Sequence, residues 1–262
     1  MVSARKWSVV NQKGGVGKTT TAVNLSTAFA AMGEKVLLID LDPQGNATTS
    51  FGLMSSEREK TIYNAMIDAE NTLSGYIIDT YIPGLSLLPG SIDLSGVDIE
   101  LYDKENKLYI LDAKLKTIEE QYDFIIMDCP PSLGFITVNA MCASNGILVP
   151  LQCEFFALEG LSQLLHTVEK IQGNLNPNLE VEGIILTMFD QRNRLSAQVS
   201  EDVRSYLGTM VYNTIVPRNV RLSEAPSYGK PALIYDLNCN GSQAYLRLAK
   251  EIKARIAAEI IA

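Results

Sequence analysis

The sequence has little histidine or tryptophan, and its cysteines are few and far apart. One histidine and one tryptophan occur in 262 residues, and no C-x-x-C pair is formed by the four cysteines Cys129, Cys142, Cys153 and Cys239. This spacing argues against both a zinc site and a disulfide framework, so we expect isolated, small buried thiols. The single histidine, His166, lies within a helical pattern of leucines, and we expect it to be structural or exposed.

The sequence also lacks a long hydrophobic run. No uninterrupted apolar segment approaches the ~20 residues of a membrane-spanning helix, and the first residues do not resemble the apolar region of a signal peptide. We therefore expect a cytoplasmic protein with no stable insertion into a membrane. Hydrophobic residues make up 47% of the chain. That is enough to bury a sizeable core, and 262 residues can form one α/β domain.

Charge is unevenly distributed along the chain. The formal net charge is −8, but residues 1–190 carry 12 basic and 24 acidic side chains, whereas residues 191–262 carry 10 basic and 6 acidic ones. An acidic protein can still present one basic face, because local fields decide whether a polyanion binds. The asymmetry therefore permits nucleic-acid binding by the last quarter of the chain without requiring it.

The most informative stretch is a glycine-rich loop between a strand-like and a helix-like run. Residues 13–20 read Lys-Gly-Gly-Val-Gly-Lys-Thr-Thr, after an apolar run at 7–10 and before helical spacing over 21–32. The glycines let successive backbone N–H groups converge on an anion, and the helix N-terminus adds partial positive charge. Lys18 would then supply an ammonium group for the β- and γ-phosphates of a nucleotide. The Thr19 hydroxyl would supply a ligand for Mg²⁺.

The loop departs from the general phosphate-loop pattern G-x-x-x-x-G-K-[ST]. The position of the first glycine is occupied by Gln12, and a second lysine, Lys13, comes directly after it. Because Lys18 already serves the phosphates of its own chain, Lys13 has two possible roles. It is either a solvated loop charge or a group that reaches a phosphate presented from elsewhere, such as the nucleotide of a second subunit.

The rest of the chain alternates strand-like apolar runs with helical patterns. Strands are predicted at 7–10, 35–40, 85–88, 122–128, 146–151, 181–188 and 211–216, and helices at 21–32, 62–67, 110–121, 156–171, 195–207 and 242–262. This alternation predicts an α/β fold with a doubly wound, mostly parallel sheet and helices on both faces. We expect a single domain over residues 1–262, in which 51–120 is the least informative part.

Acidic residues stand at the ends of two of the predicted strands. The run 35–40 ends in Asp40, with Asp42 two residues later, and the run 122–128 ends in Asp128. Pro130 and Pro131 then prevent further ladder pairing and fix a loop. Ligand-binding residues of such folds lie at the carboxyl ends of the strands. These acids are therefore candidates for the nucleotide site, the alternative for Asp128 being an acid that caps a turn.

Four motifs occur in order over nearly the whole chain. They are the loop at 13–20, Asp40-Leu41-Asp42-Pro43-Gln44-Gly45-Asn46-Ala47-Thr48, Asp128-Cys129-Pro130-Pro131, and Pro217-Arg218-Asn219-Val220-Arg221-Leu222-Ser223-Glu224-Ala225-Pro226. Together they resemble the ParA/Soj family of chromosome and plasmid partitioning ATPases, which are P-loop NTPases of the ParA/MinD superfamily with a deviant Walker A motif. The resemblance implies a weak, Mg²⁺-dependent hydrolysis of ATP to ADP and phosphate.

The resemblance also implies roles for individual residues. Nucleotide binding would use the loop residues Lys13, Gly14, Gly15, Val16, Gly17, Lys18, Thr19 and Thr20, with Pro217 and Asn219 beside the adenine. Thr19, Asp40 and Asp128 would organise the magnesium ion. The catalytic groups would be Lys13, Lys18 and Asp42, with Asp42 as the switch I carboxylate that holds the attacking water.

A further implication is that ATP joins two copies of the chain. Lys13 would reach the nucleotide of the partner subunit, so that ATP binding drives a sandwich homodimer and hydrolysis releases it. In the family, hydrolysis is stimulated by ParB (Spo0J), a centromere-binding protein with a basic N-terminal tail.

The homodimer would bind DNA non-specifically, which would place the protein on the nucleoid. The candidate DNA-binding residues are Arg192, Arg194, Arg218, Arg221, Lys230 and Arg247. Only twelve residues precede Lys13, so we expect no preceding helix-turn-helix and favour phosphate-directed binding over operator recognition. The alternative for each of these side chains is a merely solvated charge.

Two other functions compete with this interpretation. A membrane-associated division-site ATPase of the MinD type shares the loop and would use the amphipathic segment 242–262. That segment has no Trp or Phe on its apolar face, and ordinary core packing explains its spacing. A redox or metabolic enzyme, similar to the nitrogenase iron protein or a dethiobiotin-synthetase-like ligase, would need cluster-binding cysteines or a substrate motif, and we find neither.

Overall fold

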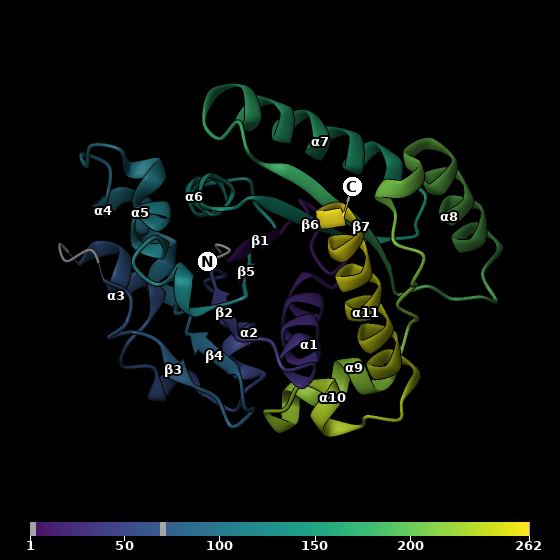
Figure 1. The fold of residues 1–262 in the computed structure, drawn as a ribbon, viewed down its shortest axis with the longest axis horizontal. Helices are drawn as coiled ribbons and strands as arrows, with labels where there is room; N and C mark the ends of the chain where they lie inside the picture. Colours follow the sequence, from purple (N-terminus) through teal and green to yellow (C-terminus); the bar gives the residue numbers. More distant parts are fainter. Residues whose placement is uncertain (1–3, 69–71, 262) are drawn as a thin grey trace.

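The structure is a computed structural model that describes residues 4–68 and 72–261. These residues form one seven-stranded sheet with the strand order β3-β4-β2-β5-β1-β6-β7 (Figure 1). Among the strands of the described residues, only β3 and β4 pair antiparallel; the other neighbouring strands are parallel. The strands are β1 (Arg5–Val9), β2 (Val36–Asp40), β3 (Ile78–Asp79), β4 (Leu85–Leu88), β5 (Phe124–Asp128), β6 (Gly146–Gln152) and β7 (Glu180–Thr187). The predicted doubly wound, mostly parallel α/β fold is confirmed.

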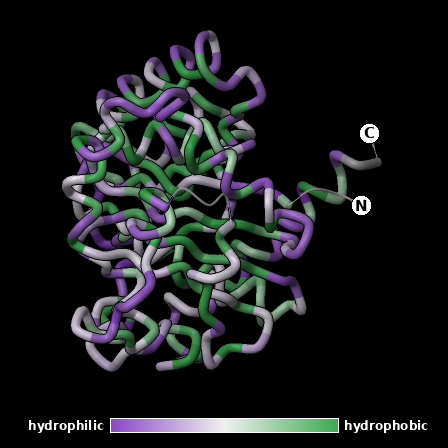
Figure 2. Tube along the Cα trace, turned by 90° about the vertical axis from the view of Figure 1, so that its left-hand side faces the viewer, coloured by the Kyte–Doolittle hydropathy of each residue, from purple (hydrophilic) through white to green (hydrophobic). Residues whose placement is uncertain are grey.

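Helices cover both faces of this sheet. The helices are α1 (Lys18–Ala31), α2 (Asn46–Thr49), α3 (Ile62–Ile67), α4 (Val97–Glu100), α5 (Ile110–Leu115), α6 (Phe135–Ala143), α7 (Ala157–Asn174), α8 (Arg194–Leu207), α9 (Val220–Glu224), α10 (Ala232–Tyr235) and α11 (Asn240–Ile261). Along β2, Leu37 and Ile39 belong to the core with α5, α6 and α7, whereas Val36 and Leu38 belong to the core with α1 and α11. This alternation results from the two-residue period of a strand. Hydrophobic segments run through the middle of the molecule (Figure 2).

The C-terminal helix packs against the first helix. Tyr245, Leu248 and Ile252 of α11 are buried, and the Tyr245 hydroxyl is hydrogen bonded to Thr21 of α1 at 3.0 Å (Figure 1). The apolar spacing of the predicted helix 242–262 is therefore explained by core packing, although its predicted last residue, Ala262, lies outside the described residues. Among the described helices, none is both long and apolar enough to cross a membrane.

The strand predicted at 211–216 is wrong. This segment comes after β7 in the chain, and the N–H groups of Tyr212 and Val216 donate to β7 carbonyl oxygens at 3.0 and 2.9 Å. Between them, however, the N–H groups of Asn213 and Thr214 donate to the Glu251 carboxylate of α11, at 2.7 and 2.8 Å. The side chain from α11 thus replaces the strand ladder, and only isolated bridges remain.

The helix predicted at 110–121 is too long. Helix α5 ends at Leu115, where the Thr117 hydroxyl donates to the Lys114 carbonyl oxygen at 2.7 Å, and Ile118 then turns into the core. Glu119 pairs instead with Lys6 of β1, at 2.6 Å. The sequence patterns also miss α6, which lies between the Pro130-Pro131 loop and β6. The other predicted elements are present, with their ends shifted by a few residues.

Candidate nucleotide site

The candidate site lies where three central strands end. Strand β5 is the neighbour of both β1 and β2, so that Asp128 stands opposite Val9 on one side and Asp40 on the other. The glycine-rich loop begins just beyond β1. The topology therefore brings together the loop and the two strand-end acids that the sequence predicts as site residues.

The loop conformation depends on glycine at two positions. Gly15 and Gly17 have φ values of +77° and +91°, a region that residues with a Cβ atom rarely adopt. Gly17 directly precedes α1, whose first residue is Lys18. The loop is also tied to its neighbours, because the Thr187 hydroxyl donates to the Val16 carbonyl oxygen at 2.8 Å. The loop therefore leads directly into the N-terminus of α1, a position at which backbone N–H groups favour an anion.

Lys18 is a buried cation inside this loop. Its side chain crosses the loop, and its ammonium group donates to the Lys13 carbonyl oxygen at 3.1 Å, while the residue is only 7% exposed. Burial lowers the pKa of Lys18, and the negative charges of Asp128 and Asp42 partly oppose this change. The ammonium group thus lies near two carboxylates and has one hydrogen bond to a neutral oxygen that an anionic ligand can replace.

Asp128 is fully buried, and its carboxylate has no satisfying partner. Across residues 4–68 and 72–261, neither of its oxygens has a hydrogen bond of normal geometry. Burial, with the charge of Asp40 as the second cause, raises the pKa of Asp128 well above its usual value, while the nearby Thr19 hydroxyl and Lys18 act in the opposite direction. A buried acid with open oxygens beside a hydroxyl is a suitable half-site for a cation.

Asp40 is equally buried but well satisfied. One carboxylate oxygen accepts hydrogen bonds from the Thr48 backbone N–H at 2.7 Å and from the Thr48 hydroxyl at 2.6 Å. The Thr48 hydroxyl accepts in turn from the Gly90 N–H at 3.0 Å. Burial raises the pKa of Asp40 to about 6, and the two bonds from Thr48 counteract part of this effect. Asp40 therefore anchors the segment after β2.

Asp42 lies on that segment and is partly exposed. One of its carboxylate oxygens accepts from the Gln44 N–H at 2.9 Å, which leaves the other without a partner among the contacts of the described residues. Its charge raises the pKa of Asp40 and of Asp128 and opposes the lowering of the Lys18 pKa. The Asp42 carboxylate is therefore close to the loop and to both strand-end acids.

The sequence patterns do not point to Arg58. Its guanidinium donates to the Gly45 carbonyl oxygen at 3.0 Å and to the Thr49 hydroxyl at 2.7 Å. Both acceptors belong to the segment that carries Asp42. It also donates to the Gly90 carbonyl oxygen at 3.1 Å. Arg58 belongs to the uninformative stretch 51–120, where it is one charge among several and no periodic pattern marks it.

A narrow cavity of about 110 Å³ adjoins the start of α1. Its walls include Pro217 and Asn219, which the resemblance places beside adenine, together with Gly17, Thr20 and Met188. The Asn219 side chain is also the N-cap of α9, where it accepts from the Arg221 N–H at 2.8 Å. The predicted base-binding residues are therefore next to the predicted phosphate loop.

Lys13 lies on the outer side of the loop. About half of its side chain is exposed, and its ammonium group forms an ion pair with Glu154, which is similarly exposed. Its backbone N–H donates to the Asn11 side chain at 3.0 Å. The Lys13 ammonium group therefore lies at the surface of the molecule, beside the Glu154 carboxylate.

The predicted DNA-binding residues form one group and three separate positions. The Arg192 side chain donates two hydrogen bonds of 3.0 Å to the Asp190 carboxylate. These bonds lower the pKa of Asp190, and the charge of Arg218 lowers it further. Arg194 begins α8 two residues later. Arg221 pairs with Glu224 and Asp236. Lys230 lines a small cavity with Thr19 and Thr20, and Arg247 is exposed on α11.

The residues present fit a magnesium ion. Within the described chain, no three His, Cys, Asp or Glu side chains are arranged to hold a metal. Mg²⁺ needs no such cluster, because it usually keeps several waters and binds through one or two carboxylates plus substrate phosphates. The open Asp128 carboxylate and the Thr19 hydroxyl satisfy that requirement. The histidine and the cysteines are not part of this site. His166 is exposed and lies beside Glu169. Of the four cysteines, Cys129, Cys142 and Cys153 are buried and Cys239 is half-buried.

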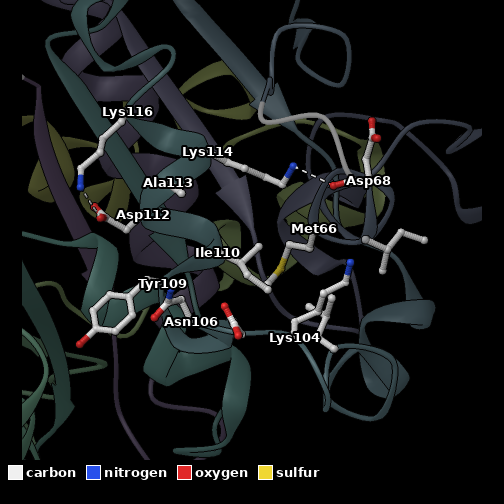
Figure 3. Close-up of a pocket in the computed structure, with 13 residues that line it drawn as sticks. Met66, Asp68, Lys104, Asn106, Tyr109, Ile110, Asp112, Ala113, Lys114 and Lys116 are labelled. Carbon is white, nitrogen blue, oxygen red and sulfur yellow. Dashed lines mark hydrogen bonds and ion pairs between the residues drawn. The ribbon is translucent and has the colours of Figure 1, made fainter.

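A second, larger cavity of about 540 Å³ lies away from the loop. It is lined by residues of α3, the loop after α4, and α5 (Figure 3). The Lys114 ammonium donates to the Asp68 carbonyl oxygen at 3.2 Å, and Lys116 pairs with Asp112 at 2.7 Å. This cavity has no glycine-rich loop, and two of the lysines that line it, Lys114 and Lys116, have their own partners, so it is a weaker candidate for a nucleotide site.

Comparisons with known proteins match a family model and curated relatives over most of the chain. A family model described as an AAA domain matches residues 4–181. The chain is 53% identical over 253 residues to the chromosome partitioning protein ParA of Caulobacter vibrioides (strain NA1000 / CB15N), covering 96% of this chain and 94% of that protein. It is 48% identical over 247 residues to the sporulation initiation inhibitor protein Soj of Bacillus subtilis (strain 168), covering 94% and 97%.

A solved structure supports the same fold. Cobyrinic acid a,c-diamide synthase from Mycobacterium smegmatis, with bound ADP and magnesium, is 33% identical with a TM-score of 0.81, and the match covers 94% of this chain and 93% of that one. The identity to ParA and Soj extends over most of the chain, and the sequence motifs, the sheet order and the glycine-rich loop lead to the same family. The chain belongs to the ParA/Soj family of chromosome partitioning ATPases.

Proposed function

We propose that this protein is a nucleotide-timed partitioning switch in the cytoplasm. Mg²⁺ and ATP bind at the loop, two copies join across their nucleotides, and the dimer holds DNA of any sequence on the nucleoid. A ParB-like partner then stimulates hydrolysis and releases the dimer. The observation that carries this proposal is the open, buried Asp128 carboxylate beside Lys18 and Thr19 at the end of the glycine-rich loop.

Phosphate binding is favoured by the groups around α1. The backbone N–H groups of the loop and the N-terminus of α1 favour an anion, and the Lys18 ammonium group would exchange its bond to the Lys13 carbonyl for the β- and γ-phosphates. Thr19 and Asp128 would hold Mg²⁺, with Asp40 anchoring the neighbouring segment. When bound, Mg²⁺ neutralises the charge that develops on the phosphate oxygens.

The hydrolytic step needs a water molecule in line with the γ-phosphate. Asp42 is a partly exposed carboxylate whose charge acts on Lys18, and its second oxygen would orient such a water. Pro217 and Asn219 would bound the adenine in the adjoining cavity. The remaining catalytic work is positioning and electrostatic stabilisation, as in other phosphoryl transfers.

In the dimer, Lys13 would contact the nucleotide of the partner subunit. The exposed ammonium group faces outward and pairs with Glu154, and such an exposed ion pair is worth little, about 0–1 kcal/mol. Lys13 could therefore leave Glu154 and pair with a phosphate of the partner's nucleotide. Dimer formation would then depend on bound ATP. Arg192, Arg194 and Arg218 would contact DNA phosphates, with Arg221, Lys230 and Arg247 as further positions.

The test compares the wild-type chain with Lys13→Ala and with Lys170→Ala, which removes an exposed lysine of α7 far along the chain from the loop. Size-exclusion chromatography with light scattering measures dimer content with ADP, ATP and a non-hydrolysable analogue. We expect ATP to dimerise the wild type and Lys170→Ala, but not Lys13→Ala. Unchanged ATP-dependent dimerisation of Lys13→Ala would refute the role of this lysine.

DNA retention is measured on the same samples across a salt series. We expect retention that requires ATP and decreases steeply with salt, because each neutralised phosphate releases counterions. Retention that is equal with ADP and ATP would contradict the proposed switch.

A further inference from the structure

Arg58 connects three segments that meet beside the nucleotide loop. It lies between α2 and α3, and its Nε and Nη2 atoms donate to the Leu53 carbonyl oxygen at 3.3 and 3.2 Å. The same guanidinium reaches Gly45 and Thr49 at the two ends of α2, at 3.0 and 2.7 Å, and Gly90 beyond β4, at 3.1 Å. One side chain thus ties both ends of α2 to the neighbouring strand.

The contact to Gly45 leads directly to Asp42. The Gly45 N–H donates to the Asp42 carbonyl oxygen at 2.8 Å, and the Gln44 N–H donates to the Asp42 carboxylate at 2.9 Å, which closes a tight turn. Arg58 holds the last residue of this turn by its carbonyl oxygen. On the buried side, Asp40 holds Thr48 of the same segment. Segment 42–49 is therefore held both by Asp40, through Thr48, and by Arg58, through Gly45 and Thr49.

The contact with Arg58 requires a glycine at position 45. Its φ is +63°, and a Cβ atom at this position would lie 1.8 Å from Nη1 of Arg58. Any larger residue would have to displace the guanidinium or open the turn. Gly45 and Arg58 thus form a matched pair, in which the absence of one side chain makes room for the other.

The acceptors of Arg58 separate it from an ordinary surface arginine. No ion pair within 4.0 Å is formed by this side chain in the described chain, and four of its hydrogen bonds go to backbone carbonyl oxygens. Arginine suits such a role because its planar fork presents several donors in fixed directions. A lysine at the same position could not satisfy acceptors on three separate segments at once.

We propose that Arg58 is a positioning residue for ATP hydrolysis, which keeps turn 42–45 closed and thereby holds the Asp42 carboxylate at the nucleotide site. This inference rests on the proposed hydrolytic function. It assigns Arg58 no contact with the nucleotide. Loss of Arg58 should therefore reduce the rate of the chemical step and leave nucleotide affinity largely unchanged.

The test uses the full chain with Mg²⁺, ATP and DNA, and compares Arg58→Ala with Arg255→Ala. Arg255 is a matched control, because it also donates to two backbone carbonyl oxygens, of Thr209 and Val211, but beside β7 at the other edge of the sheet. Rates are measured at a temperature at which circular dichroism shows every variant folded. ATP affinity is measured by titration of a fluorescent analogue.

We expect Arg58→Ala to lower kcat by about 10- to 100-fold, with the dissociation constant of the nucleotide within about threefold of wild type. Arg255→Ala should lose thermal stability but retain kcat. Added guanidinium ion, below denaturing concentrations, should restore part of the rate of Arg58→Ala only. A kcat of Arg58→Ala within about twofold of wild type, or an equal loss of kcat in Arg255→Ala, would overturn the inference.

Three further variants make this test more specific. Arg58→Lys keeps the charge and the folded state, and wild-type kcat in this variant would also contradict the inference. Gly45→Ala should reproduce the rate loss, and the double variant Gly45→Ala/Arg58→Ala should lose less than the sum of the two. Failure of the underlying function is distinguishable, because it would appear as no ATP hydrolysis by the wild type or a wild-type rate in Asp42→Ala.

Discussion

Asp40 and Asp128 are direct neighbours in the sheet and are equally buried, but they differ in the hydrogen bonds that their carboxylates accept. They are register partners on β2 and β5, each ends an apolar strand, and neither is exposed to solvent. Asp40 receives two short hydrogen bonds from Thr48 on one oxygen and a longer one of 3.3 Å from the Asp42 N–H on the other. Asp128 receives none of normal geometry within the described residues.

The difference arises from the loop after each strand. Beyond Asp40, the chain turns back through α2 and returns the N–H and hydroxyl of Thr48 to the carboxylate. Beyond Asp128, the chain continues through Pro130 and Pro131, which have no N–H to donate. One acid is therefore completed by its own loop, whereas the other keeps its oxygens open. A buried polar group without partners costs stability, so an open acid is the one to expect where a ligand binds.

The largest effect is expected for Asp128→Asn. Loss of the open carboxylate should reduce Mg²⁺-dependent ATP hydrolysis by at least about 100-fold, because the charge that holds the cation is gone. The ligand-free protein should at the same time become more stable, by about 1 kcal/mol or more, because a buried acid without partners is replaced by a neutral group. Steady-state rates and urea denaturation measure the two effects. A clear loss of stability in the ligand-free protein would break the comparison.

A smaller effect, of opposite sign for stability, is expected for Asp40→Ala. This change leaves the Thr48 N–H and hydroxyl without their acceptor, so the free energy of unfolding should fall by about 1–3 kcal/mol. Thr48→Val removes only the hydroxyl donor and should cost about 0.5–1.5 kcal/mol. Urea denaturation of the ligand-free variants gives both values. If Asp40→Ala were as stable as wild type, the hydrogen bonds of Asp40 would not be what distinguishes the two acids.

Local sequence predicts where these acids lie but not how they differ. The glycine spacing of the loop and the acid at the end of each apolar strand are short-range patterns, and both lead to residues that the structure brings together. The pattern "apolar strand, then Asp" is identical for Asp40 and Asp128. Whether the carboxylate is satisfied depends on the path of the next loop, which for Thr48 is fixed by its bond to Gly90, 42 residues away.

Long-range partners also explain what the sequence does not reveal. Arg58 joins carbonyl oxygens that are 13 and 32 residues distant, and no periodicity in 51–120 anticipates such a contact. The segment 211–216 has the composition of a strand, yet two of its N–H groups bind a carboxylate 37 and 38 residues further along the chain. In both cases a single side chain from another element determines the backbone. Patterns of hydrophobicity do not predict such contacts between a polar side chain and a distant backbone segment.

Glu251 extends the comparison to a carboxylate that, like Asp40, accepts three hydrogen bonds, but from donors on three different residues. It accepts from the backbone N–H groups of Asn213 and Thr214 and from Arg255 at 3.0 Å. Burial alone would raise the pKa of Glu251, but these donors outweigh it and lower the pKa below its usual value of 4.5. A carboxylate whose pKa is lower in the folded than in the unfolded state stabilises the protein above pH 4.5, and this contribution is lost as the pH falls through the folded-state value.

Glu251→Gln should therefore give a smaller loss of stability than the upper end of the range for Asp40→Ala, and a loss that depends on pH. At neutral pH we expect a loss of about 1–2 kcal/mol in the free energy of unfolding, because hydrogen bonds to a charged acceptor become hydrogen bonds to a neutral one. The difference from wild type should shrink as the pH is lowered from about 5 toward 3, since protonation removes the same charge from the wild type. Urea denaturation at several pH values measures this slope. A difference that stays constant over this range would show that the charge of Glu251 is not what its donors stabilise, and the ranking of the three carboxylates by their donors would then fail.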